Sequence, residues 1–520
     1  MTFFTRLMSL GLLVSLGHAA NWDAHHVLVR LDRPTTLEEA RTLLDGKDWQ
    51  VSRVLVPRLD IFLLALTDGR GVEESLRSLC RLPQVRWAQA DHFTQDRVQP
   101  DDAEFSQMWN LQQVTDADVD APEAWDVATG GTDPLGRDIV VAVVDGGMDL
   151  NHPDLMPNKW TNTGEIPGNG LDDEGNGFAD DVNGWDAYAN DGTPPFNGHG
   201  THVSGIIGAK GNNLLQVVGL NWDVDLLTVA GSSSQTSIVS IAYNYVLEQK
   251  TQWLETGGQR GANIVVTNSS FGVNFGNCST GEYPVWNDLY DAMGQVGILS
   301  ATATMNTNAN VDLQGDIPTS CPSPWLVTVT NTTSTDLRNP GAAYGATCID
   351  IGAPGTAVHS TYLNNSTANL TGTSMASPHL AGAIALVHAA MSDSLAHLVE
   401  ADPAAGALVI KDIILSTVDP LVDLQGITVS GGRLNLHGAV MAASQWPPAA
   451  EMVLSISRTA DARLLLDWTP VSGATAYHVE WRGEEGDSWQ RMETVAASPW
   501  QSVPQPPEAR GQFRVVAELP

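Results

Sequence analysis

Runs of apolar residues, separated by turns and polar loops, divide the chain into segments of different periodicity. Between residues 105 and 443 the runs contain consecutive apolar residues instead of a strict alternation, as in DIVVAVVD, DLLTVA, ANIVVTNSS, GILSATAT and WLVTVTN. Strands of this kind are buried on both faces, and helical stretches such as TSIVSIAYNYVLEQ and WNDLYDAMGQV lie between them. The pattern predicts the fold class α/β, a parallel sheet with helices on both faces, over residues 101–444.

A smaller unit precedes this domain. Strand patterns in HVLVRL, RVLVPRLDIFLLAL and QVRWAQAD alternate with helical patterns in TTLEEARTLL, capped by Thr35 or Thr36, and VEESLRSLC. These elements predict an α+β unit over residues 21–100. The polar, proline-containing stretch DHFTQDRVQPDDAE that follows predicts a linker exposed to proteolysis.

The last segment changes to strict alternation of apolar and polar residues. After QWPPAAE, the stretches RLLLDWTPV, AYHVEWR and FRVVAEL are separated by turn residues, which predicts an antiparallel β-sandwich over residues 449–520. Within it, WTPVSGATAYHVEWR resembles the tryptophan and tyrosine strands of fibronectin type III domains.

The extreme N-terminus reads MTFFTRLMSLGLLVSLGHAA, with one charge at Arg6 and an apolar stretch too short to span a bilayer. Small residues at Gly17 and Ala19 fit a signal-peptidase site, so residues 1–20 predict a secretory signal cut near Ala19 or Ala20. A buried N-terminal helix is the alternative. No second apolar stretch of spanning length follows, and we expect no membrane anchor.

Composition supports three folded units within the 520 residues, since 42% of residues are hydrophobic and 48 Gly and 28 Pro suit a loop-rich globular chain. The net charge is −34, and the excess acid lies beyond residue 100, where 14 basic residues face 48 acidic ones. Such a surface repels nucleic acid and anionic lipid. It is typical of a soluble, secreted, extracellular protein, which we expect to be a monomer.

Three polar residues stand where apolar elements begin or end. Asp145 ends the strand IVVAVVD, His199 lies where a glycine turn opens an apolar helix, and Ser374 opens another. The ends of strands and the starts of helices are where an α/β sheet places its active site. A carboxylate, an imidazole and a hydroxyl are the set that activates a serine nucleophile, although each alone is most often a turn residue or a helix cap.

The motifs that carry these residues are VAVVDGGMDLNHPDL, NGHGTHVSGIIGA and GTSMASPHLAGA, with spacings of 54 (199 minus 145) and 175 (374 minus 199). In this order they resemble the subtilases, the subtilisin-type serine peptidases, for which the order Asp, His, Ser is known. The resemblance implies a subtilisin-like fold and a serine endopeptidase that hydrolyses polypeptide substrates through an acyl-enzyme intermediate. It marks His202 and His379 as structural companions in these motifs.

The resemblance also implies an oxyanion-binding asparagine after a core strand. In GILSATATMNTNANVD the alignment gives this role to Asn306, with Asn308 and Asn310 as competitors. The stretch TNSSFG matches the segment that pairs with substrate backbone as an added strand. Its expected substrate-binding residues are Ser269, Ser270, Phe271 and Gly272, and an ordinary strand end is the alternative.

Acidic loops predict calcium. NGLDDEGNGFADDVNGWD places hard oxygen ligands densely around two glycines, and the expected Ca²⁺ ligands there are Asp172, Asp173, Asn176 and Asp180, beside Glu174 and Asp181. A solvated acidic loop is the alternative. The subtilase pattern further implies a tight calcium site at Asp154 and Asn213, and a third loop matches at Asp186, Asp191 and Thr193.

The spacing of the four cysteines is not that of a zinc site. In the subtilase pattern Cys321 and Cys348 fall on two loops that approach each other, which implies a disulfide across 27 residues (348 minus 321); free thiols are the alternative. Cys278 would then be unpaired, and Cys80 belongs to the N-terminal unit.

The N-terminal unit resembles the family's inhibitor propeptide, which implies a zymogen that cleaves itself within residues 92–104. The rival hypothesis is a catalytically silent binding or adhesion protein in which the C-terminal sandwich makes the contacts.

Overall fold

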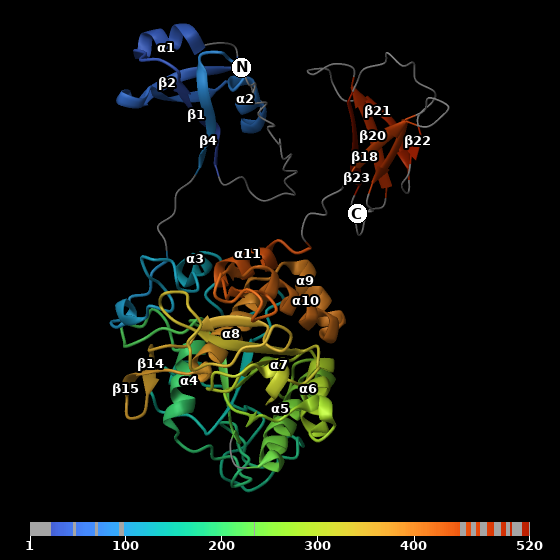
Figure 1. The fold of residues 1–520 in the computed structure, drawn as a ribbon. Coiled ribbons are helices and arrows are strands. Elements are labelled where there is room, and N and C mark those ends of the chain that lie inside the picture. Colours follow the sequence, from blue (N-terminus) through green and yellow to red (C-terminus); the bar gives the residue numbers. More distant parts are fainter. Residues whose placement is uncertain are drawn as a thin grey trace. The chain divides into compact units, whose positions relative to one another are not determined.

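The computed structural model describes residues 22–44, 48–67, 71–92, 98–232 and 235–447, and six strands between residues 454 and 518 (Figure 1). The chain separates into two compact units, with the division between Arg97 and Val98. The predicted signal segment and residues 93–97 of the predicted cleavage linker lie outside the described residues.

The first unit is a four-stranded antiparallel sheet with two helices. In the order of the sheet its strands are β2 (Trp49–Val56), β3 (Ile61–Leu66), β1 (Trp22–Leu31) and β4 (Val85–His92), and its helices are α1 (Leu37–Leu44) and α2 (Val72–Leu79). Thr36 caps α1, because its hydroxyl accepts from Glu39 N while Glu39 accepts from Thr36 N. A 3₁₀ turn over Pro57–Leu59 separates β2 from β3 within the stretch expected to form strands.

The second unit is built on a nine-stranded sheet whose strands are parallel except at one edge. Its order is β16 (Asp419–Pro420), β17 (Gly432–Arg433), β13 (Ile351–Pro354), β12 (Leu326–Thr332), β10 (Leu299–Ala303), β8 (Ile264–Ser269), β5 (Val140–Asp145), β7 (Asp225–Ala230) and β6 (Trp185–Asp186). Every residue of β5 and β8 is buried, as expected for strands covered on both faces.

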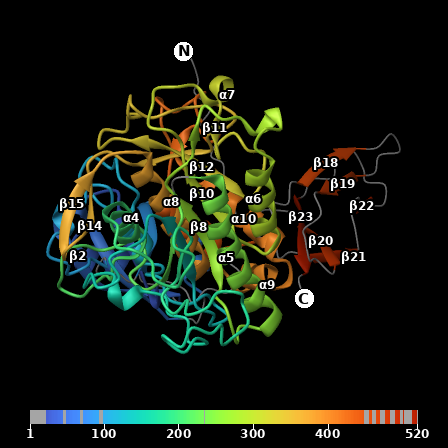
Figure 2. The same ribbon diagram turned by 90° about the horizontal axis from the view of Figure 1, so that it is seen from below.

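Two separate hydrophobic cores cover the two faces of this sheet. Along β5, Val141 and Val143 pack into one core and Val140, Ala142 and Val144 into the other, as the alternation of a strand requires. The first core lies under α3 (Ala121–Trp125), α4 (Gly198–Gly208), α8 (Thr373–Ala390), α9 (Asp393–Ala401), α10 (Pro403–Ser416) and α11 (Leu436–Ser444). The second lies under α5 (Thr236–Thr256) and α6 (Pro284–Gln295) (Figure 2). The short helix α7 (Val311–Gln314) is not part of this core. The predicted α/β architecture is confirmed.

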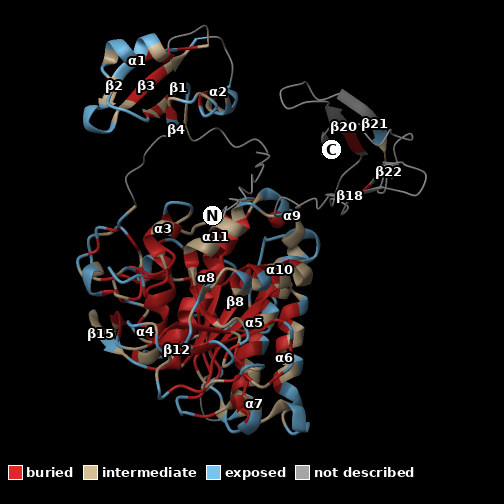
Figure 3. Cartoon of the chain, turned by 45° about the horizontal axis from the view of Figure 1, so that its top comes forward, coloured by how far each residue is buried: buried red, intermediate tan, exposed pale blue. Residues whose placement is uncertain are grey.

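Helix α8 is the most deeply placed of these helices, with only Ser374 and Ala389 outside the fully buried class (Figure 3). It packs against strands β5, β8, β10, β12 and β13 and against α4. Its position makes it a rigid support for the residue at its start.

Two small antiparallel sheets accompany the large one: β14 (Val358–Tyr362) forms a hairpin with β15 (Ser366–Leu370), and β9 (Val273–Asn274) pairs with β11 (Asp316–Ile317), which is distant in the sequence. Short 3₁₀ turns occupy Phe105–Gln107, Met156–Asn158 and Cys278–Thr280.

The expected disulfide between Cys321 and Cys348 is wrong, because Cys321 is bonded to Cys278. The hydroxyl of Ser320 accepts from Cys278 N and donates to Gly276 O, which holds together the two chain segments that follow the paired strands β9 and β11. The Cα atoms of the pair are 4.9 Å apart, within the range of disulfides. Cys348 is a free thiol whose backbone N–H donates to Asp312, and sequence separation could not show either contact.

At the C-terminus the described strands form two three-stranded antiparallel sheets. One is β18 (Leu454–Arg458), β19 (Leu464–Trp468) and β22 (Trp500–Gln501), and the other is β21 (Gln490–Val495), β20 (Ala476–Arg482) and β23 (Gln512–Glu518). The likeness to fibronectin type III stays a prediction.

Among the described residues, no single helix has the length and apolar character to cross a membrane. The bent pair formed by Thr373–Ala390 and Asp393–Ala401 passes that test by length and composition alone.

Candidate active site

Asp145 is the last residue of β5, at the carboxyl edge of the central sheet, and only 3% of its surface is exposed. Its Oδ1 accepts from the N–H of Gly146, and both carboxylate oxygens lie within hydrogen-bond distance of His199 Nδ1, at 3.0 and 2.9 Å. The carboxylate is therefore held from one side by its own turn and faces the imidazole with the other.

His199 stands in the first turn of α4, where Asn197 caps the helix by accepting from the N–H groups of His199 and Gly200. Gly200 is required for the approach of α4 to β5, since a Cβ there would lie 2.0 Å from the carbonyl oxygen of Gly147. Burial works to lower the pKa of His199, but the hydrogen bond and the negative charge of Asp145 outweigh it and raise the pKa. With Nδ1 committed to Asp145, Nε2 is the nitrogen left to exchange a proton.

Ser374 is the second residue of α8, and the other hydroxyls around it have internal partners. Thr373 donates to the carbonyl of Thr304, and Ser377 donates to Asn268 Oδ1 at 2.8 Å. Ser374 Oγ instead makes a long hydrogen bond of 3.3 Å to Ser270 O, and no bond to His199 is formed among the described residues. Such contacts are often long in a free enzyme and tighten when substrate binds.

Asn306 lies beside the start of α8. Its Oδ1 accepts from the N–H of Thr373 at 2.9 Å, while its Nδ2 donates to no group in the described part of the chain. The two competitors have other duties: Asn308 Oδ1 accepts from Arg338, and Asn310 caps α7. Of the three asparagines, only Asn306 is therefore placed to offer a free donor next to Ser374.

The predicted substrate segment straddles the end of β8. Ser269 is the last residue of that strand, with β5 and β10 paired on either side of it, and its hydroxyl bonds Tyr243 at 2.6 Å. Ser270 bonds the carbonyl of Ser374, and Phe271 packs near the rings of Tyr243 and Trp286. Within the predicted segment, only residues 270–272 lie beyond the end of β8, so only their backbone could pair with substrate as an added strand.

The two companion histidines are fully buried and bonded to groups other than the triad candidates. His202 Nε2 lies 3.0 Å from the carbonyls of Val358 and Ala368, and His379 bonds Met375 O and Asn110. Burial lowers the pKa of each to about 4, so both are neutral at physiological pH.

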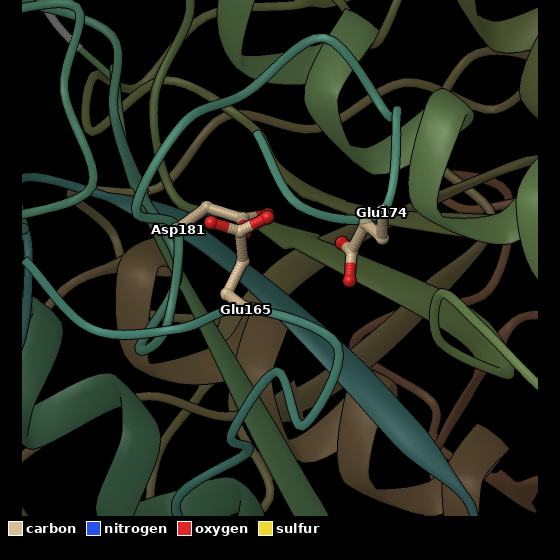
Figure 4. A group of neighbouring side chains, drawn as sticks. All are labelled: Glu165, Glu174 and Asp181. Atoms are coloured by element: carbon tan, nitrogen blue, oxygen red, sulfur yellow. The ribbon is translucent and has the colours of Figure 1, made fainter. Parts of the chain in front are cut away.

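The acidic loop brings together a different set of carboxylates from the one expected. Glu165, Glu174 and Asp181 are buried, with one oxygen of each within 4.8 Å of the others, and Figure 4 shows the carboxyl groups of Glu165 and Asp181 beside each other with Glu174 next to them. Burial raises the pKa of Asp181 to about 6 and also raises that of Glu174. One oxygen of Glu174 is buried without a hydrogen-bond partner in the described structure.

The four expected ligands in this loop have other partners. Asp172 accepts from three backbone N–H groups, Asp173 from Ile166 and Asn169, and Asp180 from Asn169 and Gly170. Asn176 donates to Glu174 and Asp181 and accepts from Phe178 N, so it supports the cluster. Asp186 and Asp191 likewise accept from backbone N–H groups of their own turn.

A second oxygen-rich place contains Asp154 and Asn213. Asn213 Nδ2 lies 3.1 Å from Asp154 Oδ1, and Asp102, which the sequence did not single out, joins them. Asp102 has one buried oxygen without a partner, and burial and then the charge of Asp154 raise its pKa against the pull of two backbone N–H groups. Asp102 lies 52 residues before Asp154 in the sequence (154 minus 102), so no local motif connects the two residues.

A buried carboxylate oriented on an imidazole, with a serine at the start of a buried helix, defines a serine hydrolase of α/β class. The chain belongs to the subtilase family, whose model matches residues 136–436, and it is a serine endopeptidase.

Individual relatives agree. The chain is 30% identical over 298 residues to thermitase of Thermoactinomyces vulgaris, covering 55% of this chain and 85% of thermitase. It is 30% identical over 400 residues to an extracellular protease of Xanthomonas campestris, covering 72% of this chain and 62% of that protein. The fold is similar to that of a protease from Pseudoalteromonas arctica at a TM-score of 0.50 and 24% identity, covering 67% of this chain and all of that one.

Proposed function

We propose that Ser374 is the nucleophile, His199 the general base and Asp145 the residue that orients and stabilises the imidazolium. The observation that carries this assignment is the double contact of His199 Nδ1 with the Asp145 carboxylate, because it fixes the tautomer that leaves Nε2 able to accept a proton. Ser374 Oγ then attacks the scissile carbonyl while His199 takes its proton. His199 returns the proton to the leaving amine, and water hydrolyses the acyl-enzyme by the same steps.

The negative oxygen of the tetrahedral intermediate requires donors in place before the reaction. Asn306 Nδ2 and the backbone N–H of Ser374, at the N-terminus of α8, are the donors we assign to it. The bond from Thr373 N to Asn306 Oδ1 supports the assignment, because it holds the amide with its nitrogen free.

Asn306→Asp should lower kcat by about 10²–10³-fold with little change in KM, the size known for such a donor in subtilisin. Aspartate keeps the oxygen that accepts from Thr373 but has no N–H to give. Asn308→Asp is the matched control, since its side chain bonds Arg338, and it should stay within threefold of wild type. Equal kcat losses in the two variants, measured on one peptide substrate, would contradict the role of Asn306.

For substrate we propose backbone pairing with residues 270–272, which leave the sheet where β8 ends. Gly272 lies so close to the β11 strand that an added Cβ would meet Ile317 O at 1.9 Å. The segment is therefore fixed against its neighbour, and main-chain recognition of this kind favours broad sequence specificity in polypeptide substrates.

We further propose that the enzyme is secreted as a zymogen and acts as a monomer. Three features support secretion as a zymogen: the signal-like first 20 residues, the compact unit that ends at Arg97, and the acidic second unit. The first unit would act as an intramolecular inhibitor until it is cleaved within residues 92–104.

Two structural calcium sites follow from the oxygen clusters. Glu165, Glu174 and Asp181 would hold one ion, and Asp154, Asn213 and Asp102 the other. Each cluster has a buried carboxylate oxygen that accepts from no donor among the described residues, which is the position a hard cation occupies. A bound ion would supply charge neutralisation and cross-link loops, without a part in catalysis.

Calcium should raise the Tm, and at 100 times Kd each site contributes about 2.7 kcal/mol, or roughly 4 °C for a domain of this size. Glu174→Gln should remove the part of the Tm gain that comes from the site of Glu165, Glu174 and Asp181. Asp172→Asn should keep that gain, because the Asp172 carboxylate already accepts from backbone N–H groups. Thermal unfolding with calcium or chelator, in a Ser374→Ala background that prevents autolysis, measures both. A full calcium gain in Glu174→Gln would refute the loop site.

The experiment that tests the catalytic assignment is casein digestion by wild type and Ser374→Ala, each with and without chelator. Equal digestion by both would contradict the role of Ser374 and would favour the rival hypothesis of a catalytically silent binding or adhesion protein.

A further inference from the structure

A cavity of about 880 Å³ lies at the opposite edge of the central sheet from the proposed catalytic residues. Its lining includes Val140, the first residue of β5, and Asp225, the first residue of β7. Asp145 and Ser269 end their strands at the other edge. No residue assigned above to catalysis, substrate or calcium lines this cavity, so the proposed function does not account for it.

Three basic side chains converge on the cavity from different elements. Lys250 comes from α5 and is 4% exposed, His388 comes from α8 and is 3% exposed, and Arg137 precedes β5. Burial, and then the positive charges of Lys250 and Arg137, lower the pKa of His388 to about 3. Both Lys250 and Arg137 therefore lie within electrostatic reach of His388, and all three side chains line the one cavity.

The charge of Lys250 has no direct counter-ion. Its single hydrogen bond goes to the neutral amide oxygen of Asn263 at 2.7 Å, and no carboxylate lies within ion-pair distance of it in the described structure. Asp133 acts on it only from farther away, since that carboxylate pairs with Arg137 Nε at 2.6 Å and accepts from backbone N–H groups. Burial, and next the charge of Arg137, lower the pKa of Lys250 to about 7.

Arg137 also has a donor to spare. Its Nε is used by Asp133, but its Nη2 is buried without a hydrogen-bond partner among the described residues. A buried cation without a counter-ion and a buried guanidinium nitrogen without an acceptor are each costly. An anion that reached both would supply the missing charge and acceptor through charge-assisted hydrogen bonds.

We propose that this cavity binds a small organic anion, whose carboxylate or phosphate group is held by Lys250 and Arg137 beside His388. Its volume is that of a site for a ligand of several carbon atoms rather than a lone ion. Trp253, whose ring lies 4.8 Å from Lys250 Nζ, and Leu254 supply apolar wall for the rest of the ligand. The acidic lining residues are Asp133, Asp138, Asp225 and Glu400, and of these only Asp133, which pairs with Arg137, is among the charges that act on Lys250.

Calorimetry on the full chain in a Ser374→Ala background tests this with benzoate, phenyl phosphate and the neutral control benzamide. We expect at least one of the two anions to bind at millimolar concentration or tighter, and which one binds identifies the head group. Benzamide should bind at least tenfold more weakly. Lys250→Met should weaken the anion at least tenfold, whereas Lys159→Met, another lysine of the lining, should change it less than threefold.

A crystal soak with 4-bromobenzoate tests the site even if Lys250→Met does not fold. It uses the cavity with Lys250 in place, and anomalous scattering locates the bromine. Bromine between Trp253 and Leu254, with the carboxylate toward Lys250, supports the site. The proposal would be overturned if neither anion bound, or if benzamide bound as tightly as the anions. It would also be overturned if folded Lys250→Met kept its affinity, or if bromine were found only outside the cavity.

Discussion

Ser374→Ala should lower kcat on peptide substrates by about 10⁶-fold, the size known for loss of the nucleophile in subtilisin. Alanine keeps the backbone N–H and the start of α8 but removes the only oxygen there that has no strong internal partner. The residual rate should remain above that of water, because the oxyanion donors and substrate contacts survive. The same change should leave residues 21–100 attached, since maturation would need the same hydroxyl.

Ser377→Ala is the matched control for this loss. Ser377 lies one turn further along α8, and its buried hydroxyl bonds Asn268 and Ala301. Its removal should cost about 1–3 kcal/mol of stability and leave kcat within tenfold of wild type. Assay of both purified variants with a chromogenic peptide, and N-terminal sequencing of each, separates chemistry from folding. A Ser374→Ala protein that still processes itself and cleaves peptide would refute the assignment.

The fold could be predicted because its strongest signals are local and agree with one another. The runs that became β5 and β8 begin with consecutive apolar residues, and each ends in a polar residue, Asp145 or Ser269, at the carboxyl edge of the sheet. Helix α8 could be recognised from its small apolar residues. The same logic proposes Asp145, His199 and Ser374 separately, since each is defined by its place in one element.

The disulfide prediction failed because pairing depends on contact between segments that are distant in the sequence. The partner of Cys321 is set by the antiparallel pairing of β9 with β11 and by the hydroxyl of Ser320, and neither has a sequence pattern that reports it. In the acidic loop, Asp172 and Asp173 stay predicted ligands because of the density of carboxylates, and in the structure they accept from nearby backbone N–H groups. Glu165 lies outside the dense stretch and reaches the cluster only through folding.

Asp145→Asn should lower kcat by about 10⁴-fold, the loss known when the same change is made in a Ser–His–Asp triad. An amide can present its N–H to His199 Nδ1, which favours the tautomer that carries the proton on Nε2 and blocks proton transfer from Ser374. The geometry should be retained, because Asn is isosteric and its Oδ1 can still accept from Gly146 N. KM should change little.

The pH profile distinguishes this role from a merely structural one. Asp145 raises the pKa of His199, and a general base must be neutral, so wild-type kcat should fall as the pH drops through a value above the usual 6.5. Without the carboxylate that raising influence is gone while burial still lowers the pKa, so the acidic limb of Asp145→Asn should move to lower pH. Asp149→Asn, in the next turn, should keep the wild-type limb, since Asp149 bonds Asn151 N and Asn364 N rather than the imidazole. An Asp145→Asn limb at unchanged pH would show that His199 is not the titrating base, whatever the loss of rate.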